Sequence, residues 1–175
     1  MDEAAVRAYY AHDALAWLPA LECLTGPLIV ALACGMRASF PRDDEASQAG
    51  FGIMVAAVPG YLLSAALGST LATLALSGQP LMPTFRLWDV FYNSAMYLLE
   101  AGYMIAFGLA FLRHGGPRWL AWLGIVGGIV QLLNASALWL HAPDAATLPG
   151  NVAILTWLAG ISVWLLRGSR VTATP

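Results

Sequence analysis

The chain has 175 residues, of which 59% are hydrophobic and only 10% are charged, and its formal net charge is -2. An average soluble domain is about 25% charged, so this composition indicates a protein whose main solvent is lipid rather than water. A protein that binds nucleic acid needs a patch of Lys and Arg that displaces counterions. The chain has no such cluster, and we exclude nucleic acid as a partner.

Five apolar stretches follow one another at residues 14–36, 51–76, 87–112, 119–140 and 151–166. Each is near the length of about 17–25 residues that carries a helix across the hydrocarbon core of a bilayer. The breaks between them hold the Pro, Gly and acidic residues that are typical of turns. The sequence therefore predicts an all-α fold, a polytopic helical membrane bundle of five transmembrane helices. Residues 1–175 form one integral membrane domain in which consecutive helices are antiparallel neighbours.

The basic residues are distributed unequally between the two sides of this bundle. Five spans place only Arg7 and Arg86 on one side, and the other side holds six arginines: Arg37, Arg42, Arg113, Arg118, Arg167 and Arg170. The side that is richer in basic residues usually faces the cytoplasm, so we expect the N-terminus outside and the C-terminus inside. All eight basic residues are Arg, which is typical of a GC-rich bacterial gene. We therefore expect the bacterial inner (cytoplasmic) membrane as the location.

Small residues and prolines inside the spans predict local features of the packing. Gly124, Gly127 and Gly128 have the spacing that lets two membrane helices approach closely, and Gly60 begins a similar series in the second span. Pro59 falls inside the second span, where it should kink the helix because it has no backbone N–H to donate.

The third span carries a polar face. At about 100° per residue, Asp89, Asn93, Tyr97, Glu100 and Tyr103 fall on one side of that helix. Glu100 lies near the bilayer midplane, where an ionised and unpaired carboxylate costs roughly 2.5–3.5 kcal/mol or more. We therefore expect it to face the interior of the bundle, and this makes it the first candidate for a functional site.

Three polar residues of other spans have comparable depths, namely Glu22, Gln131 and Asn134. At 1.5 Å per residue they all fall in the outer half of the bundle, whereas the cytoplasmic halves are almost entirely apolar. If the polar faces converge, they enclose a polar and aromatic cavity that opens outward or laterally into the outer leaflet.

Two classes of function fit such a cavity. The first is an enzyme that isomerises, cyclises or hydrolyses a lipophilic small molecule without a cofactor, with Glu100, Glu22 or Asp89 as the catalytic acid or base. Its substrate would be bound by a second group of polar and aromatic residues: Asn93, Tyr97, Tyr103, Gln131 and Asn134. The second class is a non-catalytic membrane subunit, or a protein that binds a lipid or small molecule within an assembly.

A structural explanation of the same residues stays open beside these functions. Buried polar side chains also join helices by hydrogen bonds worth about 0.6 kcal/mol on average. Asp89, in the first turn of the predicted third span, would complement the helix dipole or pair with Arg86. The partners that we expect are the lipid bilayer, a lipophilic small molecule, and a second copy or another membrane protein.

The sequence contains no motif that is typical of a metal site or a cofactor site. His12, His114 and His141 are dispersed, and the two cysteines, Cys23 and Cys34, lie eleven residues apart in one predicted helix. These positions lack the spacing of zinc ligands. We therefore predict no metal and no cofactor.

The start of the fourth span carries a resemblance to a known family. Residues 117–124 are Pro-Arg-Trp-Leu-Ala-Trp-Leu-Gly, preceded by Arg113 and followed by Gly127 and Gly128. They resemble the pattern Pro-Arg-Trp-Leu-Gly-Trp-Leu-Gly of bacterial multi-pass membrane proteins of the family called domain of unknown function 4386. The last span, which ends in Leu165-Leu166-Arg167, is similar to that group as well. The resemblance covers residues 113–170 and implies a fold type but no activity.

Overall fold

The computed structural model describes residues 2–12, 18–137 and 148–167, and the regular elements of these residues are all helices. The all-α expectation is therefore confirmed. In chain order the elements are α1 (Glu3–Tyr10), α2 (Leu18–Ala38), α3 (Glu45–Ala56), α4 (Val58–Leu76), α5 (Met82–Val90), the π-helix η2 (Phe91–Met96), α6 (Tyr97–Arg113), α7 (Arg118–Ala137) and α8 (Leu148–Leu166).

Two groups of consecutive elements form helices longer than the sequence predicts. α3 and α4 make one apolar helix over Glu45–Leu76, and α5, η2 and α6 make another over Met82–Arg113, each of 32 residues. At 1.5 Å per residue such a helix is about 48 Å long, more than the hydrocarbon core of about 30 Å. With α7 and α8, four of the described helices are long and apolar enough to cross a membrane. The described apolar part of α2, Cys23–Ala38, is shorter.

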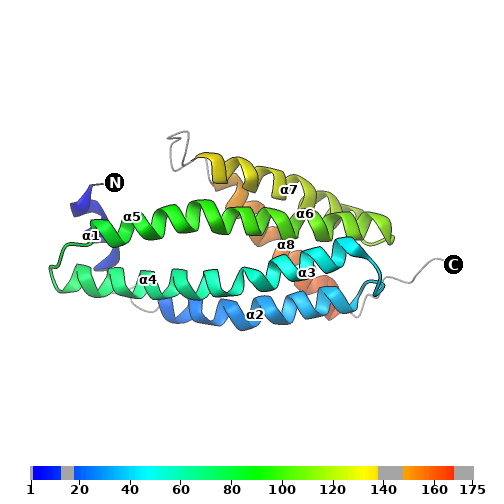
Figure 1. Cartoon of the computed structure of the whole chain (residues 1–175), viewed down its shortest axis with the longest axis horizontal. Helices are drawn as coiled ribbons and strands as arrows, with labels where there is room; N and C mark the ends of the chain where they lie inside the picture. Colours follow the sequence, from blue (N-terminus) through cyan, green and yellow to red (C-terminus); the bar gives the residue numbers. More distant parts are fainter. Residues whose placement is uncertain (1, 13–17, 138–147, 168–175) are drawn as a thin grey trace.

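Consecutive helices are neighbours, as the short linkers predict. The largest helix contact joins α6 to α7, and further contacts join α3 to α6, α2 to α4 and α7 to α8. Figure 1 shows the long helices lying nearly parallel along one axis of the molecule. α1 is a short additional helix that the sequence did not predict, and it lies beside the turn between α4 and α5.

Glycines allow the closest of these contacts. A Cβ atom on Gly124 would lie 2.8 Å from the carbonyl oxygen of Met104, and one on Gly128 would lie 2.9 Å from that of Ala101. A Cβ atom on Gly60 would collide with Met96. The small residues therefore bring α6 and α7, and α4 and η2, into close contact, as their spacing predicts.

Each long helix is interrupted once. The first is interrupted at Ala57, between α3 and α4, where Pro59 has no N–H to bond the preceding turn. The bend between the two segments can be followed in Figure 1. The second contains the π-helix Phe91–Met96, a wider turn that is frequent at functional sites.

α1 is held on the turn between α4 and α5 by apolar packing and by one arginine. Val6 of α1 is buried against Leu71 and Leu81. Arg7 donates hydrogen bonds to the carbonyl oxygens of Leu74, Ala75 and Gln79 at distances of 2.8–3.3 Å. Because the last carbonyls of a helix lack partners within it, Arg7 completes the C-terminus of α4.

The opposite end of the bundle carries most of the arginines. The C-terminal ends of α2, α6 and α8 and the N-terminal ends of α3 and α7 meet there (Figure 1). This arrangement gathers Arg37, Arg42, Arg113, Arg118 and Arg167 at what we call the Arg-rich end. Arg7 and Arg86 lie toward the end that carries α1, and Arg170 lies outside the described residues.

The half of the bundle toward the Arg-rich end is filled by large apolar side chains. They form one buried cluster that includes Met36, Phe40, Phe107, Phe111 and Trp164. Phe111 packs edge to face against both Phe40 and Trp164, with ring centroids 5.2 and 4.9 Å away. This core closes the bundle at that end, as the apolar sequence of the cytoplasmic halves predicts.

Candidate functional site: a buried carboxylate on a lateral cavity

Glu100 lies in α6 with only 4% of its surface exposed, and both of its carboxylate oxygens are hydrogen-bonded. The hydroxyl of Tyr61 in α4 donates to Oε1 at 2.9 Å. The side-chain amide of Gln131 in α7 donates to Oε2 at 2.8 Å. The carboxylate thus joins three helices, and it faces protein as its cost in lipid requires.

The orientation of Gln131 is set by a second amide. Asn134 donates from Nδ2 to Oε1 of Gln131 at 2.8 Å, so the NH2 group of Gln131 faces Glu100. On the other side, the hydroxyls of Tyr61 and Tyr103 lie 3.3 Å apart. These five residues form a continuous chain of hydrogen bonds, which we call the Glu100 network.

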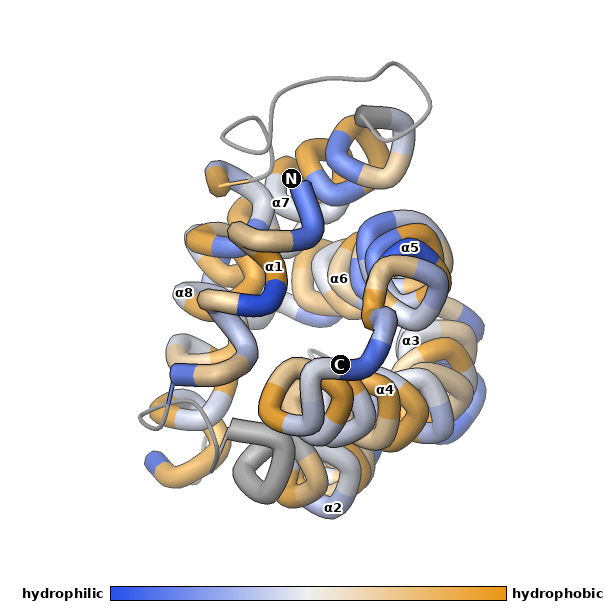
Figure 2. Tube along the Cα trace, turned by 90° about the vertical axis from the view of Figure 1, so that its left-hand side faces the viewer, coloured by the Kyte–Doolittle hydropathy of each residue, from blue (hydrophilic) through white to orange (hydrophobic). Residues whose placement is uncertain are grey.

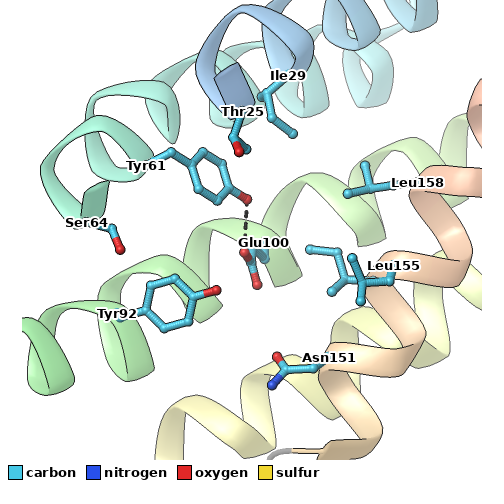
Figure 3. Close-up of a pocket in the computed structure, with 10 residues that line it drawn as sticks. Thr25, Ile29, Tyr61, Ser64, Tyr92, Glu100, Asn151, Leu155 and Leu158 are labelled. Atoms are coloured by element: carbon cyan, nitrogen blue, oxygen red, sulfur yellow. Dashed lines mark hydrogen bonds between the residues drawn. The ribbon is translucent and has the colours of Figure 1, made fainter. Parts of the chain in front are cut away.

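A cavity of about 390 Å³ lies against this network. Figure 3 shows the hydroxyl of Tyr61 pointing at Glu100, with Tyr92 further back along the same long helix and Asn151 facing the same space from α8. The lining combines polar and apolar residues from α2, α4, η2, α6 and α8: Thr25, Ile29, Tyr61, Ser64, Tyr92, Glu100, Asn151, Ile154, Leu155 and Leu158. This combination is typical of a site for a small molecule with an apolar body and a polar group.

The cavity lies where α8 is separated from α2 and α4. α8 packs mainly on α7 and has only a small contact with α2, and it stands apart from α4 in the end-on view of Figure 2. Leu155, on the cavity wall, is 66% exposed, and Leu28 of α2 is 63% exposed. The wall that α8 contributes to the cavity therefore includes an exposed apolar side chain, Leu155.

The first turn of α8 packs directly on the amide pair. A Cβ atom at Gly150 would collide with the side chains of both Gln131 and Asn134. Glycine at this position therefore lets α8 approach close enough to place Asn151 at the cavity.

The structure brings together most of the residues that the sequence selected near Glu100. Gln131 donates a hydrogen bond to Glu100 directly. Asn134 is connected to Glu100 through its own hydrogen bond to Gln131. Tyr103 joins through Tyr61. Tyr97 is buried at the start of α6, and its ring packs edge to face on Tyr92 of the cavity wall, with centroids 5.8 Å apart.

Asp89 and Asn93 do not share the position of Glu100. Asn93 donates to Asp89 at 2.6 Å within their own helix, and Asp89 lies eleven residues, or about 16 Å along the axis, from Glu100. The π-helix between them also shifts the angular register, so the even 100° spacing assumed for this face is wrong. The expected place of Asp89 in a first helical turn is wrong as well, because α5 begins at Met82.

Several cavity residues were missed by the sequence analysis. Tyr61, Ser64, Tyr92 and Asn151 line the cavity. Tyr61 and Ser64 are isolated polar groups in an apolar stretch, Tyr92 directly precedes Asn93, and Asn151 begins the last apolar stretch. The only available signal was the place of Tyr61 directly beside Gly60, where a neighbouring helix approaches.

For Glu22, a predicted catalytic residue, the structure describes the position in the helix but not the side chain. Glu22 lies in α2, one turn before Thr25 of the cavity wall, but its side chain lies outside the described part of the chain, as does the whole of His141. No group of three or more His, Cys, Asp or Glu side chains in the described residues is arranged to hold a metal ion. Cys23 and Cys34 are both free and exposed.

A second buried carboxylate lies at the Arg-rich end. Asp44 caps α3 by accepting from the backbone N–H of Ser47 at 2.6 Å. Its other oxygen lies 3.0 Å from Nε2 of His114 and 3.8 Å from Arg113. Burial raises the pKa of Asp44, but the nearby His114 side chain and the hydrogen bonds from Ser47 outweigh it and hold the pKa below its usual 3.8. The contacts of Asp44 therefore connect the start of α3 with the end of α6.

Comparisons of the chain with protein-family models, with curated proteins and with solved structures find no match. The resemblance of residues 113–170 to domain of unknown function 4386 therefore stays a prediction. What this chain does has to be inferred from its own residues and their geometry.

Proposed function

We propose that the chain is a five-span protein of the bacterial inner membrane, with its N-terminus outside, that binds a lipophilic small molecule in the cavity beside Glu100. Four described helices of membrane length support the membrane placement, and we take α2, whose described apolar part is shorter, as the fifth span. The gathering of five arginines at one end supports the cytoplasmic orientation of that end. In this orientation the cavity lies in the outer half of the bundle and opens toward lipid between α2 and α8.

One observation carries this proposal: a buried carboxylate lies on the wall of a cavity whose lining also includes apolar side chains, of which Leu155 is largely exposed. A molecule dissolved in the bilayer can reach such a site sideways, bury its apolar body against Leu155 and Leu158, and present its polar group to Glu100. The bilayer itself is the expected source of the ligand.

The same geometry supports acid–base chemistry on that ligand. Glu100 can transfer a proton to or from a bound molecule, while Tyr61 and Gln131 hold the carboxylate in place. Isomerisation, cyclisation or hydrolysis of a lipophilic substrate needs such a group and no cofactor.

Binding is tested by what the purified protein retains. We expect organic extracts of the wild-type protein to contain a lipophilic compound that is depleted from a Leu155→Trp variant, in which the larger ring fills the cavity. Leu166→Trp is the matched control, because Leu166 is exposed at the far end of α8. Identical extracts from all three proteins would contradict the proposal.

Catalysis is tested by Glu100→Gln, which keeps the size of the side chain and removes the proton-transferring group. We expect conversion of the retained compound to fall about 10²–10⁴-fold while the unfolding temperature stays unchanged. Glu45→Gln, at an exposed position of α3, is the matched control. Full conversion by Glu100→Gln would limit the protein to binding.

A non-catalytic membrane subunit is the second candidate, and one observation favours it. Both oxygens of Glu100 already accept hydrogen bonds from other helices, which is the arrangement of a carboxylate that joins helices. In that case Glu100→Gln leaves both stability and ligand retention nearly unchanged.

A further inference from the structure

We propose that the Glu100 cavity selects lipophilic molecules that carry a cationic ammonium group. This inference rests on the proposed binding function and adds the charge of the ligand. The juxtaposition that carries it is a buried carboxylate, bonded only by neutral groups, beside a cavity lined by hydroxyl and amide oxygens and aromatic rings.

The partners of Glu100 donate hydrogen bonds but bring no charge. Tyr61 donates through its hydroxyl, and Gln131 donates through an NH2 group whose orientation Asn134 sets. Two donors solvate an ionised carboxylate well. When Glu100 is ionised, they leave its negative charge uncompensated in a medium where an isolated charge is costly.

The protein itself offers no cation to this carboxylate within the described residues. The chain has no Lys. The seven described arginines belong to the two ends of the bundle, and the ion pairs found there involve Glu3 and Asp44. A ligand that brings its own positive charge would therefore supply the missing partner.

The remaining polar lining can accept hydrogen bonds from an ammonium group, and the charge of an ionised Glu100 disfavours an anion. Tyr61, Tyr92 and Asn151 face the same space as Glu100 (Figure 3) and present oxygen atoms that accept hydrogen bonds from N–H groups. Aromatic rings also attract cations. Four aliphatic side chains then cover the apolar part of the ligand: Ile29, Ile154, Leu155 and Leu158.

The test compares three probes of equal chain length that differ only in the head group: dodecylamine, 1-dodecanol and dodecanoate. Binding is measured by calorimetry with the full chain in nanodiscs of a zwitterionic phospholipid, with empty nanodiscs subtracted. We expect dodecylamine to bind at least about tenfold more tightly than 1-dodecanol, because hydrogen bonds to charged groups are the stronger ones. Dodecanoate should bind most weakly.

Two variants assign this preference to the site. Glu100→Gln should bring the affinity for dodecylamine down to that for 1-dodecanol, and Glu45→Gln, which removes an exposed carboxylate elsewhere, should keep the preference. Thermal unfolding of both variants checks that they are folded. A preference for the amine that survives in Glu100→Gln would overturn the assignment to this cavity.

Other outcomes separate this inference from the proposed function. Equal binding of the amine and the alcohol, or tighter binding of dodecanoate, overturns the cationic ligand but leaves a lipophile-binding cavity. A rise in unfolding temperature with sodium chloride but not with N-methylglucamine chloride, lost in Glu100→Gln, would assign the site to an inorganic cation instead. If no probe binds and the extracts of wild type and Leu155→Trp are identical, both proposals fail.

Discussion

Glu100 and Asp44 are both buried carboxylates, yet the protein surrounds them differently. Asp44 lies at the Arg-rich end, where it caps α3 and contacts the side chains of His114 and Arg113. Glu100 lies deep in the bundle, accepts hydrogen bonds from Tyr61 and Gln131 alone among the residues that the structure describes, and borders a cavity.

The difference indicates which carboxylate serves structure and which is available to a ligand. A carboxylate whose helix cap and charged partners come from the same chain is complete without any other molecule. A carboxylate with neutral donors alone has a charge, when it is ionised, that a proton or a cationic ligand can neutralise. Four experiments test this contrast, and they are ordered by the size of the effect that we expect.

Asp44→Ala should have the largest effect on stability. We expect a loss of about 3 kcal/mol, because a helix cap is worth about 1 kcal/mol and removing the carboxylate leaves the buried Nε2 of His114 without its polar neighbour, which costs about 1–3 kcal/mol. Chemical unfolding in detergent measures it. Asp43→Ala is the control, since Asp43 is exposed next to it. Equal losses in the two variants would refute the role given to Asp44.

Gly150→Ala should destabilise the Glu100 network by about 1–3 kcal/mol, the usual cost of overpacking. The added methyl group collides with Gln131 and Asn134, so ligand retention should fall as well. At Gly52, in helix α3, a Cβ atom meets nothing within 4 Å, and Gly52→Ala should be neutral or stabilising. If Gly150→Ala is as stable as Gly52→Ala, α8 does not pack on the network as described.

Lowering the pH should remove the stabilisation that Asp44 contributes to the folded protein. Its pKa is lower in the folded state than the usual 3.8, so its stabilisation is present above that value and is lost as the pH falls through the folded pKa. The stability difference between wild type and Asp44→Asn should therefore be full at about pH 7 and shrink below about pH 4. Unfolding curves of both proteins across this range measure it, and a constant difference would contradict the ion pair.

Tyr61→Phe should have the smallest effect on stability. The ring stays and one hydrogen bond between helices is lost, which costs about 0.6 kcal/mol on average in a membrane. If Glu100 serves a ligand, however, this variant should alter ligand retention more than stability. Tyr9→Phe, at an exposed position of α1, is the control for the loss of a hydroxyl. A large loss of stability without any change in retention would favour the purely structural role of Glu100.

The sequence by itself determined the helical class, the approximate positions of the long apolar helices and the inward direction of Glu100. Each of these depends on one property of a short stretch, because the length of an apolar run sets a helix and the cost of a carboxylate in lipid sets its direction. The close contacts at Gly124 and Gly128 were predictable for the same reason, since a residue without a side chain allows a close approach wherever it lies.

Only the tertiary structure decided which polar groups meet. Tyr61 bonds to Glu100 across 39 positions in the sequence, and Gln131 does so across 31, and no local pattern encodes such pairs. The π-helix at residues 91–96 changed the register that an even helical spacing assumes, and this separates Asp89 and Asn93 from the site. The cavity exists because α8 packs on α7 rather than on α2, which is a property of whole helices and not of any one residue.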